Sequence, residues 1–417
     1  MKPGREERRH FEETGSFVDE MLTSSVFAPP SGPLTGVKVL DFCSFINGAY
    51  SAMMMGDLGA EVIKIEPLTG DPARAWGPFL KGESRFYQAW NRNKRCLALN
   101  LTSLSGREII YYLTANADVV LENFRPGVTE KLKIDYLSLQ RINPRIIYCS
   151  STAFGAAGPY RDRPGYDPVL QSLSGVARDN LRFGGKVTIC PVAVSDYQAS
   201  MLALSAINAA LYHREKTGEG QRIETSLLHG IMSIHAHHFV EPLDCEEEGA
   251  LGIYPYRFFE TRDDLIFIAA GTDKFWRMLC EAIGAAELGA NAKYSTNGQR
   301  AEHRDELTAM LNDYFPLKTT EEWEALLIEK GVPCASAKSY REFFADPQVT
   351  AMEMNPIIEH PLIGRLRMAG VPFRFEKTPG SVQRPAPLLG QHTDEILRGL
   401  GYDEENIAQM RKEGIIA

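Results

Sequence analysis

Asp196 has the strongest sequence context for catalysis in this chain. It follows a short apolar approach, residues 191–194, and directly precedes Tyr197–Arg214, an Ala- and Leu-rich segment that is expected to be a long buried helix. Free backbone N–H groups and the helix dipole stabilise a carboxylate at the start of a helix. An Asp at such a position usually serves as an N-cap, so position alone leaves a catalytic and a capping role open.

Two other polar motifs suggest ligand binding. The basic run Asn91–Arg95 follows Trp90, and cations beside an aromatic ring suit the phosphate and base of a nucleotide. A solvated loop is the more ordinary interpretation of such a run. Asp167 lies in Arg163–Pro168, a loop rich in turn-forming residues, where an acid carries little information by itself.

Several other chemistries lack the residue patterns that they need. His235, His237 and His238 fall on different faces of a helix, and no carboxylate completes an HExxH motif, so no metal is predicted. The seven cysteines are odd in number and never spaced as CxxC. This pattern fits neither a disulfide framework nor a zinc site, and it favours a reducing, intracellular setting. A serine triad has no GxSxG motif to build on.

Alternating strands and helices are expected to position these residues. Apolar runs at 37–42 and 61–66 flank a helix-compatible segment, which is typical of a βαβ unit and a parallel sheet. The alternation continues with a helix near 105–115, a strand at 118–122, a helix within 128–141 and a strand at 145–149. We therefore expect an α/β fold with a doubly wound parallel sheet.

A dinucleotide cofactor does not fit the first βα turn. Glu66 ends the second predicted strand, where a Rossmann acid would hold a ribose hydroxyl. The turn after the first strand, Cys43–Tyr50, has one glycine where the GxGxxG motif needs three. We therefore predict no NAD.

The pattern of predicted strands and helices changes after about residue 250. Strand-like runs at 256–260 and 265–269 flank polar residues and predict a hairpin. Helical segments follow at 273–285, 304–314 and 320–330, which indicates a smaller α+β unit. After Pro356 the chain is strand-like and then ends in helices at 393–400 and 403–412.

Charge and hydropathy restrict the partners. The net charge of −9 argues against a nucleic acid or an anionic membrane as partner, because both are held mainly by Lys and Arg. The first 20 residues mix acids with bases and have no apolar stretch, which is unlike a signal or transit peptide. No run approaches the roughly 20 apolar residues that cross a bilayer, so we expect a cytoplasmic protein.

Seven stretches, in order along the chain, resemble the class III CoA-transferases of the formyl-CoA transferase type, a family that also includes the α-methylacyl-CoA racemases. They are residues 34–41, 56–66, 91–95, 122–127, 164–167, 216–221 and 387–393. The resemblance implies an enzyme that moves CoA from a donor thioester to a carboxylic acid. The most similar members pass CoA between dicarboxylates, which implies succinyl-CoA as donor and a dicarboxylate as acceptor.

The resemblance also implies roles for particular residues. In the transferases an aspartate matching Asp196 is the nucleophile, which forms an anhydride and then an aspartyl-CoA thioester. The helix-start amides would then offer donors to developing negative charge. Asp167 falls where transferases place a supporting acid. Positions that match the family's CoA contacts, together with Arg95, which is added for its charge, are Asn47, Arg95, Leu99, Asn123, Phe124, Arg125, Lys131 and Asp167. Arg74 and Arg257 are candidate anchors for an acceptor carboxylate.

The family architecture implies two discontinuous domains and an interlocked homodimer. The large CoA-binding domain would comprise 34–249 and 346–417, the small α+β domain 250–345, and an N-terminal extension residues 1–33. CoA or acyl-CoA would enter as substrate, without a metal or NAD.

Two departures from the family pattern bear on the reaction. The glycine-rich loop of the formyl-CoA enzyme is matched by the segment 248–252, which holds fewer glycines. A racemase has a His where this chain has Tyr166, and tyrosine is a poor base near neutral pH. The missing His disfavours a racemase, which stays an alternative to a transferase together with a non-catalytic acyl-CoA-binding relative.

Overall fold

The computed structural model describes residues 32–179, 181, 185–245 and 252–417. These residues form two compact units. The large unit contains the described residues up to Val240 together with Met352–Ala417, and the small unit contains those within Glu241–Ala351. The predicted N-terminal extension lies outside the described residues except for its last two positions.

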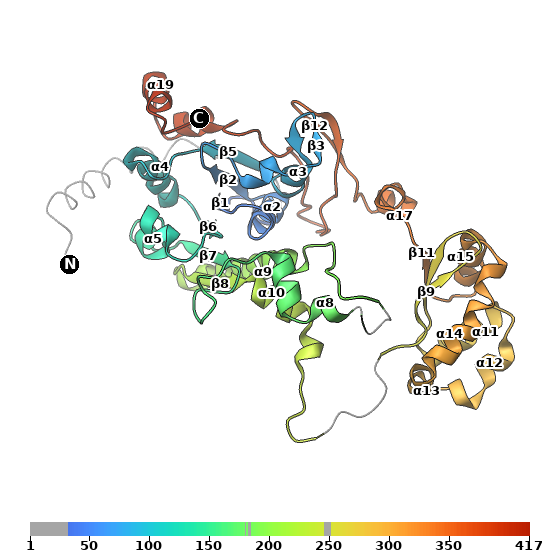
Figure 1. Ribbon diagram of the computed structural model, residues 1–417. Helices are drawn as coiled ribbons and strands as arrows, with labels where there is room; N and C mark the ends of the chain where they lie inside the picture. The colour runs from blue at the N-terminus through green and yellow to red at the C-terminus, as the bar shows by residue number, and fades with distance from the viewer. Residues whose placement is uncertain (1–31, 180, 182–184, 246–251) are drawn as a thin grey trace. The chain divides into compact units, whose positions relative to one another are not determined.

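A six-stranded parallel sheet forms the centre of the large unit (Figure 1). In the order in which they lie in the sheet, its strands are β5 (Lys94–Ala98), β2 (Glu61–Glu66), β1 (Lys38–Asp41), β6 (Val119–Glu122), β7 (Ile147–Thr152) and β8 (Arg222–Ser226). The predicted α/β class with a large parallel sheet is confirmed. The chain builds outward from β1 to β5 and then from β6 to β8, so the strand order reverses between β1 and β6. Ligands of such sheets bind at the carboxyl ends of the strands beside this reversal.

Helices and small strand pairs complete the large unit. The helices are α2 (Ala49–Asp57), α3 (Arg85–Trp90), α4 (Leu104–Ala115), α5 (Val128–Leu132), α6 (Tyr136–Gln140), α7 (Asp167–Leu173), α8 (Val176–Asp179), α9 (Val194–Thr217), α10 (Leu227–Ile234), α18 (Thr393–Gly399) and α19 (Glu404–Lys412). Short 3-10 helices are η1 (Pro72–Ala75) and η3 (Ala236–Phe239). Two antiparallel pairs are β3 (Phe79–Leu80) with β4 (Glu83–Ser84), and β12 (Ile357–His360) with β13 (Gly364–Arg367).

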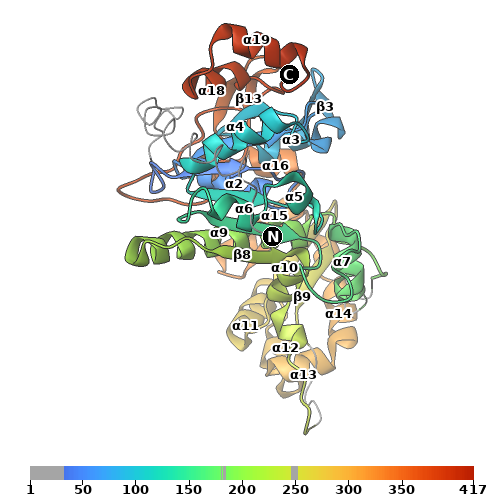
Figure 2. The ribbon, with the colours of Figure 1, turned by 90° about the vertical axis from the view of Figure 1, so that its left-hand side faces the viewer.

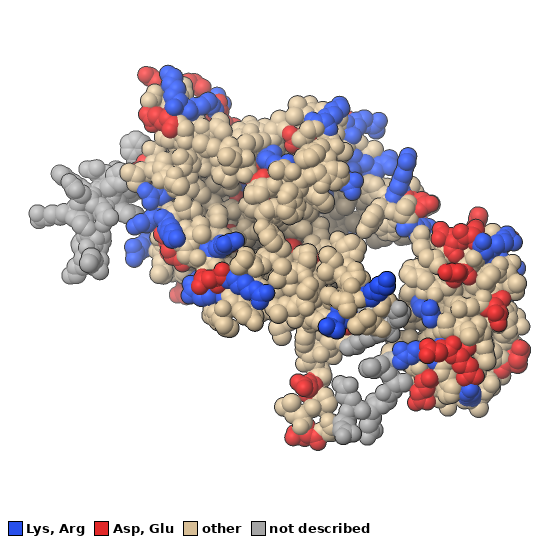
Figure 3. Space-filling view, in the orientation of Figure 1, with Lys and Arg blue, Asp and Glu red and all other residues tan. Residues whose placement is uncertain are grey.

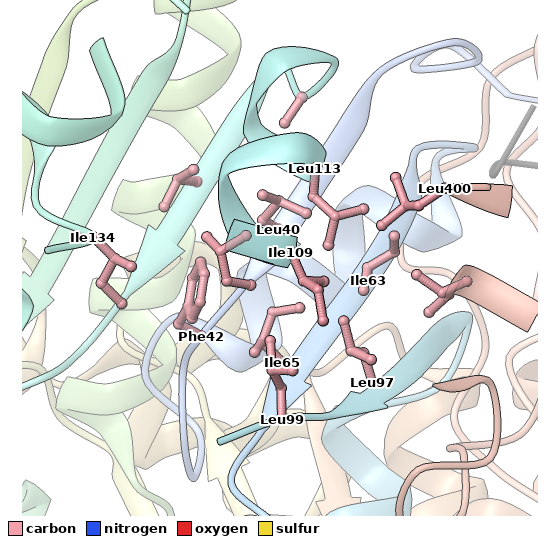
Figure 4. Packing of buried hydrophobic residues seen from close by; sticks show 14 of the residues in the cluster. Leu40, Phe42, Ile63, Ile65, Leu97, Leu99, Ile109, Leu113, Ile134 and Leu400 are labelled. Atoms are coloured by element: carbon pink, nitrogen blue, oxygen red, sulfur yellow. The ribbon is translucent and has the colours of Figure 1, made fainter. Parts of the chain in front are cut away.

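Alternation along the strands divides the large unit into two hydrophobic cores. Leu40, Ile63 and Leu97 pack with α4 and with the C-terminal helices (Figure 4). Val39 and Val62 pack with α2 and α9. Successive strand side chains point to opposite faces, so helices cover both faces of the sheet. Two views show α18 and α19, which come last in the chain, beside α4 (Figures 1 and 2).

Three local features of the large unit differ from the sequence prediction. The helix predicted within 128–141 is two short helices, because Lys133 adopts a left-handed φ of 61° and Asp135 then caps α6. The long helix begins at Val194 rather than at Tyr197. β8 was not predicted from the sequence.

The small unit combines a three-stranded antiparallel sheet with short helices. Its strands, in sheet order, are β11 (Cys334–Ser336), β10 (Leu265–Ala269) and β9 (Tyr256–Glu260). Its helices are α11 (Asp273–Ala282), α12 (Ala286–Ala290), α13 (Asn297–Glu302), α14 (Arg304–Asn312), α15 (Thr320–Glu329), α16 (Tyr340–Phe344) and α17 (Pro347–Ala351), with 3-10 helices η4 (Ala292–Tyr294) and η5 (Phe315–Leu317). The predicted hairpin is confirmed, since Leu265 pairs with Glu260.

Charged side chains of both signs are scattered over the surface. On the large unit in Figure 3, blue and red side chains lie singly or in small groups around a centre of uncharged residues. Among the described residues, no helix is long and apolar enough to cross a membrane.

Candidate active site

Asp196 lies in the first turn of α9, but it is not the N-cap of that helix. The N-cap is Ala193, and no side chain makes a capping hydrogen bond from that position. The capping alternative raised by the sequence is therefore wrong. The Asp196 side chain is half-buried, and its place in the first turn keeps its carboxylate near the positive end of the helix dipole.

Asp167 supports the start of α9 from a neighbouring helix. It is 4% exposed and is the first residue of α7, not a loop residue as the sequence suggested. Its Oδ1 accepts from the Ser195 backbone N–H at 2.7 Å and from the Ser195 hydroxyl at 2.6 Å. Its Oδ2 accepts from Nε2 of Gln171 at 2.5 Å. Asp167 thus satisfies an N–H group that the first turn of α9 leaves without a helical partner.

Two helix-start amides are therefore engaged within the protein. The Val194 N–H donates to the Val192 carbonyl at 2.8 Å, and the Ser195 N–H donates to Asp167. The sequence predicted that such amides would serve developing negative charge in the reaction. These two amides precede Asp196 in the chain, so the expectation about the amides that follow Asp196 stays a prediction.

The loop that follows β1 supplies a different donor to Asp196. The backbone N–H of Asn47 forms a hydrogen bond with the Asp196 carboxyl group. The Asn47 side chain is engaged elsewhere: Nδ2 donates to the Ser151 carbonyl at 3.0 Å, and Oδ1 accepts from the Ser151 hydroxyl at 2.7 Å. Since Ser151 lies in β7, these bonds fix Asn47 to the carboxyl end of the sheet.

Asn123, the residue after β6, holds the same loop. Its Oδ1 accepts from the Ser44 N–H at 2.9 Å, and its Nδ2 donates to the carbonyls of Ser44 at 2.7 Å and Asn47 at 2.9 Å. The sequence predicted both Asn47 and Asn123 as CoA contacts. Their side chains hold the loop that brings the Asn47 N–H to Asp196, so both side chains are already engaged within the protein.

The surroundings of Asp196 favour its neutral form more than water does. Burial and the negative charge of Asp167 raise the pKa of Asp196 to about 7, against the lowering effect of the Asn47 N–H. A carboxyl group with this pKa is partly ionised near neutral pH, and its carboxylate is more basic than that of an ordinary Asp. The arrangement suits a nucleophile or a general base.

Four other predicted CoA contacts lie near the carboxyl edge of the sheet. Leu99 follows β5, is buried beside Ile416, and donates its N–H to the Glu66 carbonyl at 2.8 Å. Phe124 is half-buried and Arg125 is exposed, and both follow β6 directly. Lys131 is exposed in the last turn of α5. The two cations are suited to phosphate groups.

Arg95 does not join this group. It is the second residue of β5, so it lies near the amino end of its strand. In a parallel sheet all amino ends share one edge, which places Arg95 at the edge away from Asn47 and Asn123. Its Nη1 also donates to Oε1 of Glu395 in α18 at 2.8 Å, so its charge is engaged in holding that helix.

The other two cations of the basic run are buried as well. Arg92 pairs with Asp57 at 2.7 Å, and Lys94 pairs with Asp41 at 2.7 Å. Both cations are at most 3% exposed, so the solvated-loop interpretation is wrong. The run ties β5 to α2 and β1.

The two arginines considered as acceptor anchors also have partners. Arg74 donates to Glu66 at 2.7 Å and to the Tyr87 hydroxyl at 2.6 Å. Arg257 belongs to β9 of the small unit and donates to the Thr308 hydroxyl at 3.1 Å.

A cavity of about 480 Å³ lies in the large unit, away from the residues around Asp196. It is lined by Lys94, Glu359, His360, Pro361, Arg384, Pro385, Gln391 and His392. Because Lys94 is the first residue of β5, this cavity lies toward the amino end of that strand. None of the predicted site residues lines it.

The three histidines lie closer together than helical spacing predicted. α10 ends at Ile234, and His237 and His238 belong to η3, so the ring centroids of His237 and His238 are 3.9 Å apart. His235 and His238 also lie 4.0 Å and 3.7 Å from Asp179. Within the part of the chain that the structure describes, no group of three or more His, Cys, Asp or Glu side chains is arranged to hold a metal ion.

The sequence did not predict the residues that hold the predicted site residues in place. Ser195, Gln171 and Ser151 are hydrogen-bond partners of predicted residues, and polar residues of these types gave no signal of their own. The segment 248–252, predicted to replace a glycine-rich loop, lies outside the described residues except for Gly252.

Comparison with known proteins connects this site to a family. Residues 34–393 match the model of CoA-transferase family III. The chain is 36% identical over 393 residues to succinyl-CoA:glutarate CoA-transferase of Homo sapiens, covering 92% of this chain and 90% of that protein. It is 34% identical over 382 residues to succinate–glutarate CoA-transferase of Agrobacterium fabrum, covering 88% and 96%. A CAIB/BAIF family protein from Brucella suis has a similar crystal structure, with a TM-score of 0.76 and 32% identity, covering 89% of this chain and 100% of that chain.

Proposed function

The chain belongs to CoA-transferase family III, and we propose that it transfers CoA from succinyl-CoA to a dicarboxylic acid with Asp196 as the nucleophile. The position and the hydrogen bonding of Asp196 carry the proposal. Asp196 lies beside the strand reversal of the sheet, does not cap its helix, and receives a hydrogen bond from a loop that other residues hold in place.

In the proposed reaction the Asp196 carboxylate attacks the thioester carbonyl of the donor. The C–S bond breaks, which gives a mixed anhydride and the CoA thiolate. The thiolate then attacks the aspartyl carbonyl of the anhydride, so the donor acid leaves as its carboxylate and an aspartyl-CoA thioester remains. This sequence divides a difficult exchange into steps that each conserve an activated acyl group.

The acceptor completes the exchange by the same steps in reverse. Its carboxylate attacks the aspartyl thioester and releases CoA thiolate, which then attacks the acceptor's carbonyl in the new anhydride. The products are the new acyl-CoA and the free Asp196 carboxylate. The Asn47 N–H is placed to stabilise negative charge on an Asp196 oxygen, both in the free carboxylate and when it leaves. The partial burial of Asp196 helps to keep water from the anhydride.

CoA itself is proposed to lie along the carboxyl edge of the sheet. Arg125 and Lys131 are the exposed cations for its phosphates, and the backbone of Asn47, Leu99 and Asn123 lines the approach to Asp196. The choice of succinyl-CoA and a dicarboxylate rests on the relatives, whose names pair succinyl-CoA or succinate with glutarate.

Replacing Asp196 with the near-isosteric Asn tests this reaction. The protein is incubated with succinyl-CoA and a panel of mono- and dicarboxylic acids, and the acyl-CoA products are identified by mass spectrometry. We expect new acyl-CoA species with the parent protein and a loss of at least about a thousandfold in rate with Asp196→Asn, because the covalent step is removed.

A matched control separates this loss from general damage. Asp179→Asn changes a half-buried acid in α8, outside the residues that hold Asp196. It should leave the exchange rate within about twofold, since it lies outside the chemistry. Undiminished exchange by Asp196→Asn would refute the mechanism.

The assembly and setting of the enzyme are also proposals. We propose an interlocked homodimer, supported by large apolar side chains that are exposed on the single chain around α10 and after it, such as Met232, Ile234 and Phe239. We further propose that 34–249 with 346–417 and 250–345 are its two domains. A cytoplasmic location is supported by the seven cysteines, all of which are free thiols.

A further inference from the structure

Glu122, the last residue of β6, is a buried acid that the proposed reaction does not use. It is 4% exposed. Of the five other acids that are buried among the described residues, Asp41, Asp57, Glu66 and Asp71 each pair with a neighbouring Lys or Arg side chain, and Asp167 accepts from Ser195 and Gln171 near Asp196. Glu122 receives its hydrogen bonds from neutral groups. An acid kept in such a place at a cost in desolvation calls for a local explanation.

The hydrogen bonds of Glu122 shape the chain immediately after it. Its Oε2 accepts from the Phe124 backbone N–H at 2.9 Å, two residues along. The Ser150 hydroxyl, directly opposite on β7, also bonds to the carboxyl group. The side chain therefore fixes the turn in which Asn123 lies, between a strand end and the Phe124 amide.

That turn aims Asn123 at the loop after β1. The three hydrogen bonds of the Asn123 side chain to Ser44 and Asn47 require this orientation. Asn47 in turn donates its N–H to Asp196. The hydrogen bonds of Glu122 and of Asn123, joined through the backbone of the turn and of the loop, thus connect Glu122 to the Asn47 N–H that faces the Asp196 carboxyl group.

We propose that Glu122 is a positioning residue of this site, which acts through Asn123 to hold the Asn47 N–H against Asp196. Loss of the Glu122 acceptor lets the turn and the loop move, and Asp196 then loses the donor that favours its carboxylate. The inference deepens the proposed function, because it names what sets the ionisation of the nucleophile.

Few ionisable groups interact with Glu122 and Asp196. Asp167 and Tyr197 interact with Asp196, and the groups that interact with Glu122 are Cys43, Cys149, Tyr148, Glu130 and Arg222. Burial raises the pKa of Glu122 to about 7. The variants below are therefore compared over a pH range in which both Glu122 and Asp196 change charge.

The test measures the protonation of Asp196 directly in the full-length protein. A water-soluble carbodiimide activates protonated carboxyl groups, and mass spectrometry of the peptide containing Asp196 follows its modification against pH. In Glu122→Ala we expect the midpoint to move upward by roughly one pH unit, because a hydrogen bond to the charged form is lost. Glu122→Gln keeps an oxygen acceptor for the Phe124 N–H, so its midpoint should match that of the parent protein.

Two further variants keep the test decisive. Asn123→Ala should shift the midpoint as Glu122→Ala does. The double variant should shift it no further, because Glu122 and Asn123 both act by holding the Asn47 N–H in place. If Glu122→Ala fails to fold, Asn123→Ala and Glu122→Gln carry the comparison. A parent-like midpoint in a folded Glu122→Ala or Asn123→Ala protein, or a shift in Glu122→Gln, would overturn the proposal.

A kinetic measurement adds a readout of function. The acid limb of kcat/KM should follow the same order of variants as the carbodiimide midpoint. The labelling needs neither CoA nor turnover, so it tests Glu122 even if Asp196→Asn shows that the proposed reaction is wrong.

Discussion

Asp167 and Asp196 lie near each other but have different hydrogen-bond partners. Asp167 accepts from the Ser195 amide, the Ser195 hydroxyl and Gln171, which stabilise its charge. The Asp196 carboxyl group receives the Asn47 N–H and faces the negative charge of Asp167. Environments that distinguish two carboxyl groups in this way commonly assign them different roles, which favours the proposed supporting role for Asp167 and the proposed reacting role for Asp196.

The pH dependence of exchange should report this difference. The nucleophile must be ionised, so kcat/KM should rise through about pH 7, the pKa of Asp196, and level off above it. Asp167→Asn removes the neighbouring charge that raises this pKa, so the rise should move to lower pH. The measurement is the pH profile of kcat/KM for both proteins. A rise that stays at the same pH, or moves upward, would contradict the role given to Asp167.

The roles of single residues were only partly predictable from the sequence. Asp196 was proposed because an apolar approach and a long helix lie next to it in the chain. Asn47 and Asn123 were predicted to lie near the site, but their side chains bond to partners 76 to 104 residues away. Such partners are set by how strands pair in space, which residue type and local spacing do not encode.

Strands and helices were predictable where their apolar pattern is strong. β2 and the β9–β10 hairpin have the predicted bounds. β8 and α7 were missed, because β8 is largely polar and α7 begins with Asp-Pro within a turn-rich segment. Their positions depend on tertiary contacts, which outweigh local propensity.

The basic run shows how elements distant in sequence are tied together. Arg92 pairs with Asp57 of α2, and its guanidinium also donates to the carbonyls of Ala369 and Gly370 in the C-terminal segment. The sequence indicated a surface loop because five polar residues follow one another. The acids that pair with these buried cations lie outside the run, so the spacing of residues could not match them to it.

Breaking the Arg92–Asp57 pair should strongly destabilise the large unit. Asp57→Ala leaves a buried guanidinium without its carboxylate, which costs about 3–5 kcal/mol in the free energy of unfolding. Glu404→Ala, which removes the partner of exposed Arg398, should cost below about 1 kcal/mol. Urea denaturation of both variants measures the difference, and equal losses would show that the buried pair does not hold the unit together.

The whole large unit is organised around the strand reversal between β1 and β6. The Asn47 loop follows β1, Asn123 follows β6, and α9 brings Asp196 to the donor that they hold. This position could be predicted, since a doubly wound sheet places its ligands there. The cavity of about 480 Å³ is lined by Lys94 at the amino end of β5 and by none of these residues.

The proposed assembly predicts a mass that dilution does not change. Size-exclusion chromatography with light scattering should give twice 46.5 kDa. Interlocked chains can separate only if part of one chain unfolds, so the mass should persist at low concentration and high salt. A mass of 46.5 kDa under native conditions, or a dimer that dissociates on dilution, would contradict interlocking.

Covalent capture of Asp196 is the sharpest test of the proposed reaction. The protein is mixed with succinyl-CoA, treated with hydroxylamine, and digested for mass spectrometry of the peptide that contains Asp196. Hydroxylamine cleaves both an aspartyl anhydride and an aspartyl-CoA thioester, and attack at the aspartyl carbonyl gives a hydroxamate. We predict a hydroxamate at Asp196 that requires succinyl-CoA. Exchange of CoA in the same sample without modification of Asp196, or a hydroxamate on a different acid, would contradict the mechanism.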